Sequence, residues 1–437
     1  MKEIHVGLIG FGTVGSGLAQ VLKDQQLRIV EKSDLAIRLK TVADINVASL
    51  PPDFGNIRLT RDASEIFNDP EISIVVELIG GIEPAKTFIL KAIAAGKHVV
   101  TANKALISQH GREIFAAAAE KGVEVGFEAS VGGGIPVIKS LKEGLVANRI
   151  DSLMGIMNGT ANYILTQMTD HGTPFEEVLR EAQKMGYAEA DPTYDVEGID
   201  TAHKLAILMA IAYGMNIRLA DISTEGISKI KPIDIQFARE FGYRVKLLAI
   251  SNNYGDHVEA RVHATMVPED HMLASINGAY NGIYFTGDEV GNVMLYGYGA
   301  GKLPTGSAVA ADVVDIARNI QFNCVGRVPW LAYLPQNIND IAITPMAQLT
   351  CPYYFRITAQ DRPGVLSAIS GILGNHGISI ESVVQKKRRE QGAVPIIILT
   401  YEAQEENVNR ALAEIDALET TAAETLKIRI LVEKGNE

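Results

Sequence analysis

An acidic segment near the middle of the chain holds the side chains best suited to proton transfer. Residues 184–204 set carboxylates and a lysine on a loop rich in glycine and proline, which runs into an apolar helix expected to begin near Ile199. Asp200 and Lys204 are four residues apart, so on that helix they share one face. Spacing alone favours an exposed ion pair worth about 0.3–0.5 kcal/mol. A substrate site is the second interpretation, because the rest of the chain carries a dinucleotide-binding pattern that needs one. The carboxylates are Glu189, Asp191, Asp195, Glu197 and Asp200.

A glycine-rich turn near the N-terminus predicts a dinucleotide-binding site. An apolar strand over residues 4–9 leads into Gly10-Phe-Gly-Thr-Val-Gly15 and then into a helical pattern. Gly10 permits the tight turn, Gly12 lets the backbone approach a pyrophosphate, and Gly15 lets the helix pack closely on the strand. The helix N-terminus offers unpaired N–H groups to the phosphates. The expected cofactor contacts are Gly10, Phe11, Gly12, Thr13, Val14 and Gly15.

Alternating strand and helix patterns through residue 127 predict a parallel sheet of the Rossmann type. Parallel strands need right-handed crossovers, and ligands of such sheets bind at the carboxyl ends of the strands. Residues 24–35 resemble a loop insertion in this pattern. The further strands are expected at 39–43, 74–79, 96–101 and 123–127, with helices at 84–95 and 105–121.

Two polar residues follow strands of this sheet. Asp44 closes the strand at 39–43, where a carboxylate accepts from a ribose 2′-OH and repels a 2′-phosphate, so it favours NAD; it is equally compatible with a turn residue that ends the strand. Lys104, in Thr101-Ala-Asn-Lys104, lies a short reach from the expected nicotinamide position, or else contacts a phosphate or solvent.

A glycine-rich loop over residues 128–136 closes the nucleotide-binding half. Its three consecutive glycines, 132–134, expose main-chain carbonyls, and Glu128 adds a hard oxygen, so a small hard cation is one possible ligand. The residues alone favour a plain hinge between the domain at 1–135 and the one that follows.

The pattern changes to α+β over residues 136–304. Residues 243–300 alternate with a period of two, which predicts antiparallel strands beside helices in a substrate-binding and dimerisation domain. A helix of small residues at about 305–323 is expected to return to the nucleotide-binding domain.

The C-terminal part has a different organisation. Residues 324–350 are rich in Pro and Asn and are interpreted as a linker. Residues 351–437 have the pattern βαββαβ and lack any candidate nucleophile or base, which is typical of a binding module.

Composition excludes several classes of partner. The formal net charge is −12, and the basic run Lys386–Arg389 is followed at once by Glu390, so we interpret it as a solvated loop and expect neither nucleic acid nor membrane as a partner. Cys324 and Cys351 lack metal spacing and fit a reducing compartment. No signal peptide is recognised, and no apolar run approaches the ~20 residues of a membrane span. We expect a cytoplasmic protein.

Together these motifs resemble homoserine dehydrogenase, in the single-function bacterial form with a C-terminal ACT domain. The similarity runs along the whole chain and rests on Gly10–Gly15, Thr101–Lys104, Asn158–Asn162 and Gly186–Lys204. Asp361-Arg-Pro-Gly364 resembles the ligand loop of ACT domains. The family interconverts L-homoserine and L-aspartate 4-semialdehyde with NAD(P), on the route to threonine, methionine and isoleucine.

The resemblance implies roles for individual residues. Lys204 takes the place of the catalytic proton donor and Lys104 that of a second lysine near the nicotinamide, with Asp200 orienting Lys204. Glu189 and Asp195 would bind the substrate. Cofactor contacts are implied at Thr101, Lys104, Gly186 and Gly301.

A cation and an effector are also implied by the resemblance. A sodium-binding loop is matched by Glu128, Val131, Gly133 and Ile135. Threonine is expected as a feedback inhibitor near Asp361, Gly364, Asn375 and Gly377. Many members carry arginine after the second strand to hold a 2′-phosphate, whereas this chain has Ala43-Asp44-Ile45-Asn46, which argues against a preference for NADP. Unpaired sheet edges suggest a homodimer or homotetramer.

The expected chemistry agrees with these residues. The ammonium of homoserine needs a carboxylate, and its hydroxyl proton needs a base. A free lysine has a pKa of about 10.4, so we expect Lys204, kept charged by Asp200, to protonate the aldehyde at neutral pH and homoserine oxidation to be faster at alkaline pH. Two alternatives stay open: an aspartate dehydrogenase, which needs no acidic segment of this spacing, and a redox or amino-acid sensor, which would lack Lys204.

Overall fold

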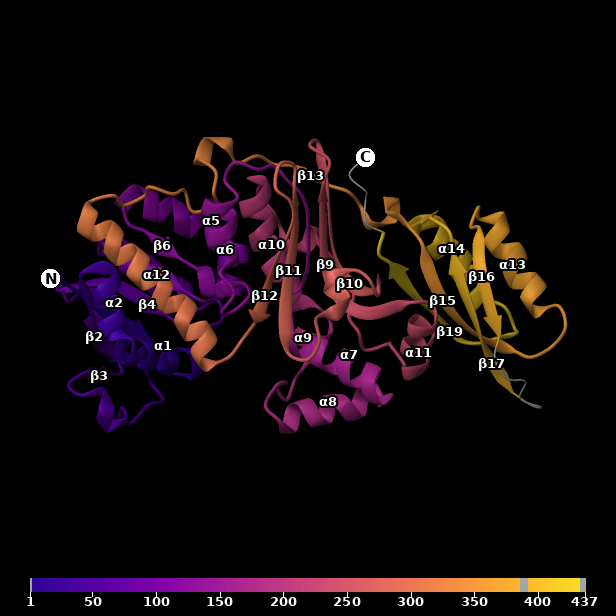
Figure 1. The fold of residues 1–437 in the computed structure, drawn as a ribbon, viewed down its shortest axis with the longest axis horizontal. Helices are drawn as coiled ribbons and strands as arrows, with labels where there is room; N and C mark the ends of the chain where they lie inside the picture. The colour runs from indigo at the N-terminus through magenta and orange to yellow at the C-terminus, as the bar shows by residue number, and fades with distance from the viewer. Residues whose placement is uncertain (1, 386–391, 433–437) are drawn as a thin grey trace.

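The computed structural model describes residues 2–385 and 392–432, which form three regions in a row (Figure 1). The N-terminal region and the C-terminal region lie at opposite ends, with a mixed sheet and its helices between them. The basic run Lys386–Arg389 lies outside the described residues. Within the described ranges, no helix has the length and apolar character needed to cross a membrane.

The N-terminal region is built on a six-stranded parallel sheet with the order β3-β2-β1-β4-β5-β6. The order reverses between β1 and β4, and the carboxyl ends at such a switch point form a ligand crevice. The strands are β1 (Lys2–Ile9), β2 (Leu35–Ala43), β3 (Arg58–Thr60), β4 (Ile72–Glu77), β5 (His98–Thr101) and β6 (Val125–Gly126). The helices are α1 (Thr13–Asp24), α2 (Gln26–Ser33), α3 (Ser64–Phe67), α4 (Ala85–Ala94) and α5 (Lys104–Lys121).

The prediction of a loop insertion at residues 24–35 is wrong. Helix α1 extends to Asp24, α2 follows, and β2 already begins at Leu35. Five of the eight residues of α2 are polar, so its helical pattern is weak in the sequence. Ile29 nevertheless packs against the core of this region, and α2 lies along β2.

Helix α12 (Lys302–Phe322) returns from the central region to pack along α1 (Figure 1). Two glycines permit this close approach. A Cβ on Gly17 would stand 2.1 Å from the Lys302 carbonyl oxygen, and one on Gly306 would stand 2.7 Å from the Gly17 carbonyl carbon.

The central region combines an antiparallel sheet with a buried helix. Helix α10 (Ile199–Tyr213) begins after Gly198 and ends before Gly214, both left-handed, and almost all its residues are buried. A helix that is apolar on all sides is stable only in a protein interior. The other elements are α6 (Val137–Lys139), β7 (Ile150–Ile156), α7 (Gly159–His171), α8 (Phe175–Lys184), α9 (Thr193–Val196), β8 (Ser223–Thr224), α11 (Pro232–Glu240), β9 (Tyr243–Asn253), β10 (His257–Pro268), β11 (Tyr280–Gly287) and β12 (Gly291–Tyr298).

The C-terminal region has the predicted βαββαβ order in β15-α13-β16-β17-α14-β19. The elements are β14 (Thr350–Cys351), β15 (Tyr353–Gln360), α13 (Val365–Asn375), β16 (Ile380–Gln385), β17 (Ala393–Thr400), β18 (Ala403–Gln404), α14 (Glu405–Asp416) and β19 (Thr421–Ile430). The preceding segment is not wholly detached, because β13 (Ala342–Ile343) pairs with β10.

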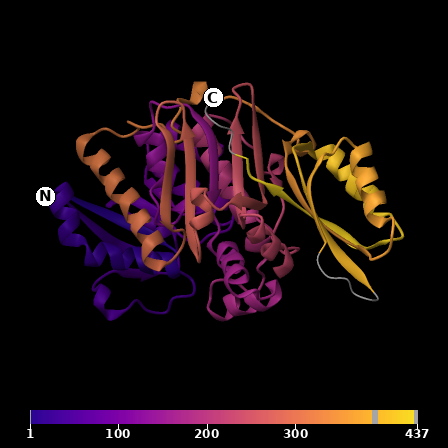
Figure 2. The same cartoon turned by 45° about the vertical axis from the view of Figure 1, so that its right-hand side comes forward.

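Strand β19 joins the C-terminal and central regions into one continuous sheet. It pairs in parallel with β10 through Thr265 and Arg429, and Figure 2 shows it extending toward the central strands. Buried Arg429 pairs with Glu405 of its own region and, at 2.7 Å, with Glu225 of the central region. The shared sheet and the buried ion pair make this a rigid interface between the two regions rather than a flexible linker. The predicted α/β class is confirmed: a parallel nucleotide-binding sheet, a central region with a mixed sheet and helices, and a C-terminal βαββαβ unit.

Candidate active site

Two lysines from different regions meet at one buried carboxylate. Asp200 lies in the first turn of α10, and Lys204 one turn later places its Nζ 2.8 Å from Asp200 Oδ2. Lys104, the first residue of α5, places its Nζ 2.6 Å from Asp200 Oδ1. Asp200 is 2% exposed and Lys204 7%, so the alternative of a solvated surface ion pair is wrong.

Asn158 completes this cluster, although it was not among the predicted site residues. Its Nδ2 donates to Asp195 Oδ1 at 2.7 Å and to Asp200 Oδ2 at 2.8 Å. Its Oδ1 caps α7 by accepting from the Ala161 N–H. The carbonyl oxygen of Met157 accepts from Lys204 Nζ at 2.5 Å. The polar Asn-Gly-Thr turn was the available signal, but only the tertiary fold brings it to the acidic segment.

Burial and charge act against each other in the cluster. Burial lowers the pKa of Lys204 below its ordinary value, and the attraction of Asp200 offsets this only in part. Burial alone would raise the pKa of Asp200, but Lys204 and Lys104 together hold it well below its usual range. Asp200 therefore favours the charged form of Lys204, as expected, but desolvation is the larger effect and leaves the pKa below that of a free lysine.

Tyr194 and His203 also belong to the site and were not predicted. Lys104 Nζ lies 5.7 Å from the centre of the Tyr194 ring, a cation–π arrangement. The His203 ring stacks on the Tyr194 ring, with 5.6 Å between the two ring centres. Burial, with Asp200 and Asp195, raises the pKa of Tyr194 to about 12, so its hydroxyl stays protonated at neutral pH.

The two predicted substrate ligands lie differently. Asp195 is half-buried within the cluster, and burial raises its pKa, while the hydrogen bond from Asn158 opposes that rise. Glu189 is exposed, on the loop between α8 and α9 that also holds Gly186. The carbonyl oxygen of Glu189 accepts from Gln183, and its carboxylate stands outside the bonded cluster of described residues.

The glycine turn has the geometry expected for phosphate binding. Gly10 has a φ of 96°, and a Cβ on Gly15 would stand 2.1 Å from the Gly10 carbonyl oxygen. Nothing lies within 4 Å of a Cβ built on Gly12, so its surface is open to a ligand. Helix α1 has no side-chain cap, which leaves the N–H groups that follow Gly12 available.

The remaining predicted cofactor residues have structural partners. Asp44 Oδ2 accepts from the Phe11 N–H at 2.7 Å and Oδ1 accepts from the Asn46 N–H at 2.8 Å, so this carboxylate also organises the turn. Thr101 is fully buried, and its hydroxyl donates to Glu77. Gly301, with a φ of 125°, precedes α12.

Comparisons with known proteins agree with this arrangement. Family models match residues 10–128 as "Homoserine dehydrogenase, NAD binding domain", residues 136–314 as "Homoserine dehydrogenase" and residues 353–420 as "ACT domain". A homoserine dehydrogenase of Pseudomonas aeruginosa is 47% identical over 98% of this chain and 99% of its own length. The chain belongs to the homoserine dehydrogenase family.

Other members of the family show the same likeness. The homoserine dehydrogenase of Bacillus subtilis is 37% identical, with 96% of each chain covered. A solved structure of a homoserine dehydrogenase from Thiobacillus denitrificans has a TM-score of 0.92 and 49% identity, with 99% of each chain covered. The protein is accordingly an NAD(P)-dependent oxidoreductase of amino-acid biosynthesis that acts on homoserine, and its ACT domain takes a small-molecule effector.

The loop that resembles the sodium site of homoserine dehydrogenases is tightly folded. Gly132 and Gly133 have φ values of 71° and 56°, which other residues adopt only with strain. Both carboxylate oxygens of Glu128 accept main-chain N–H groups at the start of α6, from Ile138 and Lys139 at 2.8 Å. Each oxygen of the Glu128 carboxylate thus already accepts one hydrogen bond, and the sodium site stays a prediction.

The four residues predicted for the effector are divided between the two ends of one helix. Gly364 precedes the first turn of α13 and Asn375 is its last residue, with Gly377 just beyond. A helix of 11 residues is about 16 Å long. A single amino acid cannot touch both ends within one chain.

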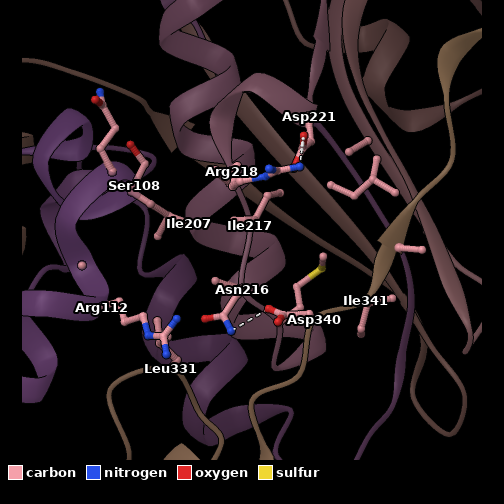
Figure 3. A pocket seen from close by; sticks show the side chains of 18 of the residues that line it. Ser108, Arg112, Ile207, Asn216, Ile217, Arg218, Asp221, Leu331, Asp340 and Ile341 are labelled. Atoms are coloured by element: carbon pink, nitrogen blue, oxygen red, sulfur yellow. Dashed lines mark hydrogen bonds and ion pairs between the residues drawn. The ribbon is translucent and has the colours of Figure 1, made fainter.

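A cavity lies beside the active site, and neither lysine lines it. It has a volume of about 810 Å³ and lies between α5, α10 and the segment that leads to the ACT domain (Figure 3). Ser108 and Ile207 lie on one wall, and Asn216 with Asp340 lies on another.

Proposed function

We propose that Lys204 transfers the proton between the protein and the substrate oxygen during the interconversion of L-homoserine and L-aspartate 4-semialdehyde. The observation that carries this proposal is the shared carboxylate, because Asp200 holds Lys204 and Lys104 side by side at the end of the nucleotide-binding sheet. NAD(P) supplies the hydride acceptor and donor. Lys204 removes the hydroxyl proton during oxidation and returns one to the aldehyde oxygen during reduction. Lys104 orients that oxygen.

The substrate ammonium is the natural partner of the acidic segment. Asp195 faces the cluster through Asn158, and Glu189 lies on the adjoining exposed loop. A cation beside Asp195 would offset the burial that raises the pKa of this carboxyl group. We assign Asp195 the inner contact with the ammonium group and Glu189 an outer contact made when the loop covers the substrate.

The rate of homoserine oxidation should depend on the deprotonation of Lys204. The base must be neutral, so kcat/KM should rise with pH and level off above the pKa of Lys204. Because burial lowers that pKa from 10.5, the midpoint of the rise should lie below 10.5. Aldehyde reduction needs the charged form and should fall over the same range. Initial rates in both directions across pH 6–11 measure this, and a reduction rate that climbs with pH would contradict it.

The cofactor preference follows from Asp44. We expect a higher kcat/KM with NAD than with NADP, because this carboxylate follows β2 at the carboxyl end of the sheet, where it would repel a 2′-phosphate. Asp44→Asn should raise the NADP-to-NAD ratio about 10-fold, since a charge near a phosphate is worth more than 1.4 kcal/mol at an effective dielectric constant of about 20. Asp44 also accepts from the Phe11 N–H in the glycine turn, so any loss of activity from disturbing this turn is common to both cofactors, and the ratio removes that common loss. Spectrophotometric assays with homoserine, and with aspartate as the rival substrate, provide the measurement; Asp24→Asn, exposed at the end of α1, is the control.

Threonine is the proposed effector of the ACT domain, bound between two copies. The support is geometric: Gly364 of one α13 and Asn375 of another can face the same ligand, whereas within one chain they are separated by the helix. Asn375→Ala should raise the threonine concentration for half-inhibition about 10-fold, the cost of roughly one hydrogen bond to a charged ligand. Asn407→Ala on α14 is the matched control. Deleting the ACT domain is a poorer test, because it also removes Arg429, the ion-pair partner of Glu225 in the central region.

The same argument favours an oligomer. Strand β12 is the edge of the large sheet, carries no charged side chain, and exposes Tyr296 and Tyr298 by more than half. Unprotected apolar edges are the usual sites of subunit pairing. We propose a homodimer through this edge, or a homotetramer when the ACT domains pair as well.

We propose that the loop at 128–135 binds a sodium ion. Main-chain carbonyls of Glu128, Val131, Gly133 and Ile135 would hold it, since hard oxygens suit such an ion. Burial and the neighbouring Glu128 raise the pKa of Asp312 to about 7, and a cation bound in the loop would favour the charged form of this carboxyl group. Its carboxylate accepts from the Glu128 N–H at 2.8 Å. Activity in sodium chloride against choline chloride at equal ionic strength measures the dependence.

A further inference from the structure

The two lysine-bearing helices are joined by a hydrogen bond that the proposed reaction does not use. Ser108 Oγ on α5 lies 2.6 Å from His203 Nδ1 on α10. Ser108 follows Lys104 by one helical turn, and His203 directly precedes Lys204. The bond therefore connects the nucleotide-binding region to the central region beside the catalytic cluster.

The environment of His203 favours a neutral ring. The residue is 3% exposed, and burial lowers its pKa; the attraction of Asp200 opposes this effect and the repulsion of Lys104 adds to it. The Ser108 hydroxyl also donates to the Ala105 carbonyl oxygen at 3.1 Å, within α5. A neutral His203 ring with its proton on Nδ1 can then donate to Ser108 Oγ, so that both bonds are made at once. Its face stacks on Tyr194, over whose ring the Lys104 ammonium lies.

These contacts form a chain from Ser108 through His203 and Tyr194 to Lys104. The Lys104 side chain is 35% exposed and has a long flexible stem, so its ion pair with Asp200 alone does not determine where its ammonium lies. The Tyr194 ring limits the positions of that ammonium, and His203 limits the positions of the ring.

We infer that the Ser108–His203 pair positions Lys104 for the reaction. The inference rests on the proposed roles of the two lysines and adds a determinant of their geometry. Displacing a catalytic group by about 1 Å can cost up to about 10²-fold in rate. Ser108 and His203 are thus positioning residues, which act on the substrate only through Lys104.

Ser108 is well suited to a test by substitution. Figure 3 shows its hydroxyl on the wall of the open cavity, together with Ile207 of α10. Alanine at this position therefore leaves no sealed void, and we expect the fold to tolerate it.

The first experiment measures steady-state kinetics of homoserine oxidation in the full-length enzyme. Ser108→Ala and His203→Phe should each lower kcat about 5- to 10-fold, the effect of one net hydrogen bond transmitted to the site, with the KM for the nucleotide unchanged. Ser108→Thr keeps the hydroxyl and should restore most of the rate. His110→Phe is the matched control on α5, where the ring lies 3.9 Å from Glu113 instead of facing α10.

The second experiment is a double-mutant cycle with Lys104→Met. If Ser108 acts through Lys104, then Ser108→Ala should change kcat by less than about 2-fold in the Lys104→Met background. The inference would be overturned by equal effects of Ser108→Ala in both backgrounds, or by a Ser108→Ala enzyme within about 2-fold of wild type. It would also be overturned if the Ser108→Thr variant were as slow as Ser108→Ala. If His203→Phe fails to fold, the Ser108 cycle decides. Failure of the proposed function would appear separately, as an active Lys204→Met enzyme.

Discussion

Lys204→Met should lower kcat for both directions of the reaction by about 10³-fold, within the usual range for loss of a general acid–base group. Methionine keeps most of the length of the side chain while removing the amine that donates to Asp200 and to the Met157 carbonyl oxygen. Asp200 retains Lys104 as a partner at 2.6 Å, so the carboxylate is not left as an unpaired buried charge. The fold should therefore persist, and circular dichroism with thermal unfolding checks it. Initial rates with homoserine and with the semialdehyde measure the effect.

A matched control separates the loss of this amine from the loss of a positive charge in general. Lys184→Met makes the same substitution at an exposed position at the end of α8, in the same segment, and should leave kcat within about 2-fold. The assignment of the proton donor would be wrong if Lys204→Met stayed within about 10-fold of wild type while Lys104→Met abolished turnover.

Asp200→Asn has the second largest expected effect, because it removes the carboxylate shared by both lysines. The attraction of Asp200 raises the pKa of Lys204 against the larger effect of burial. Without that attraction the pKa of Lys204 falls further, so the alkaline rise in homoserine oxidation should move to lower pH by at least about 1 unit. Aldehyde reduction at pH 7 should fall about 10²-fold, since less Lys204 carries the proton and Lys104 loses its anchor.

Stability should change in the same variant. Breaking a buried ion pair by removing one partner costs about 3–5 kcal/mol, and deprotonation of Lys204 should keep the loss near the lower end. Denaturant unfolding measures this loss of stability. The control is Asp191→Asn, which changes an exposed carboxylate on the loop between α8 and α9. A pH profile that stays in place or moves upward would show that Asp200 does not set the pKa of Lys204.

Local features were predictable because they depend on neighbouring residues. The strand, glycine turn and helix at the N-terminus, the helix that carries Asp200 and Lys204, and the βαββαβ order all follow from periodicity and turn chemistry. Helix α2 was missed because five of its eight residues are polar and none is fully buried, and only the packing of Ile29 shows its inner side.

Contacts between distant segments were not predictable in the same way. Asn158, Tyr194 and His203 belong to a loop end, a short helix and a buried helix face, and no spacing in the chain connects them. The direction of the Lys204 pKa was also missed. A lysine in sequence has its ordinary pKa, and only the depth of burial in the fold decides whether desolvation exceeds the attraction of its carboxylate.

The amino-acid sequence by itself determined the nucleotide-binding turn, the order of the three units and the pair of Asp200 and Lys204 on one helical face, because each depends on residues within a few turns of one another. Only the tertiary structure decided that Lys104 reaches the same carboxylate from another region and that Ser108 and His203 join the two helices. It also decided that β19 extends the central sheet. Such contacts depend on how helices and sheets pack across the whole chain, and the balance of burial and charge exists only after that packing is complete.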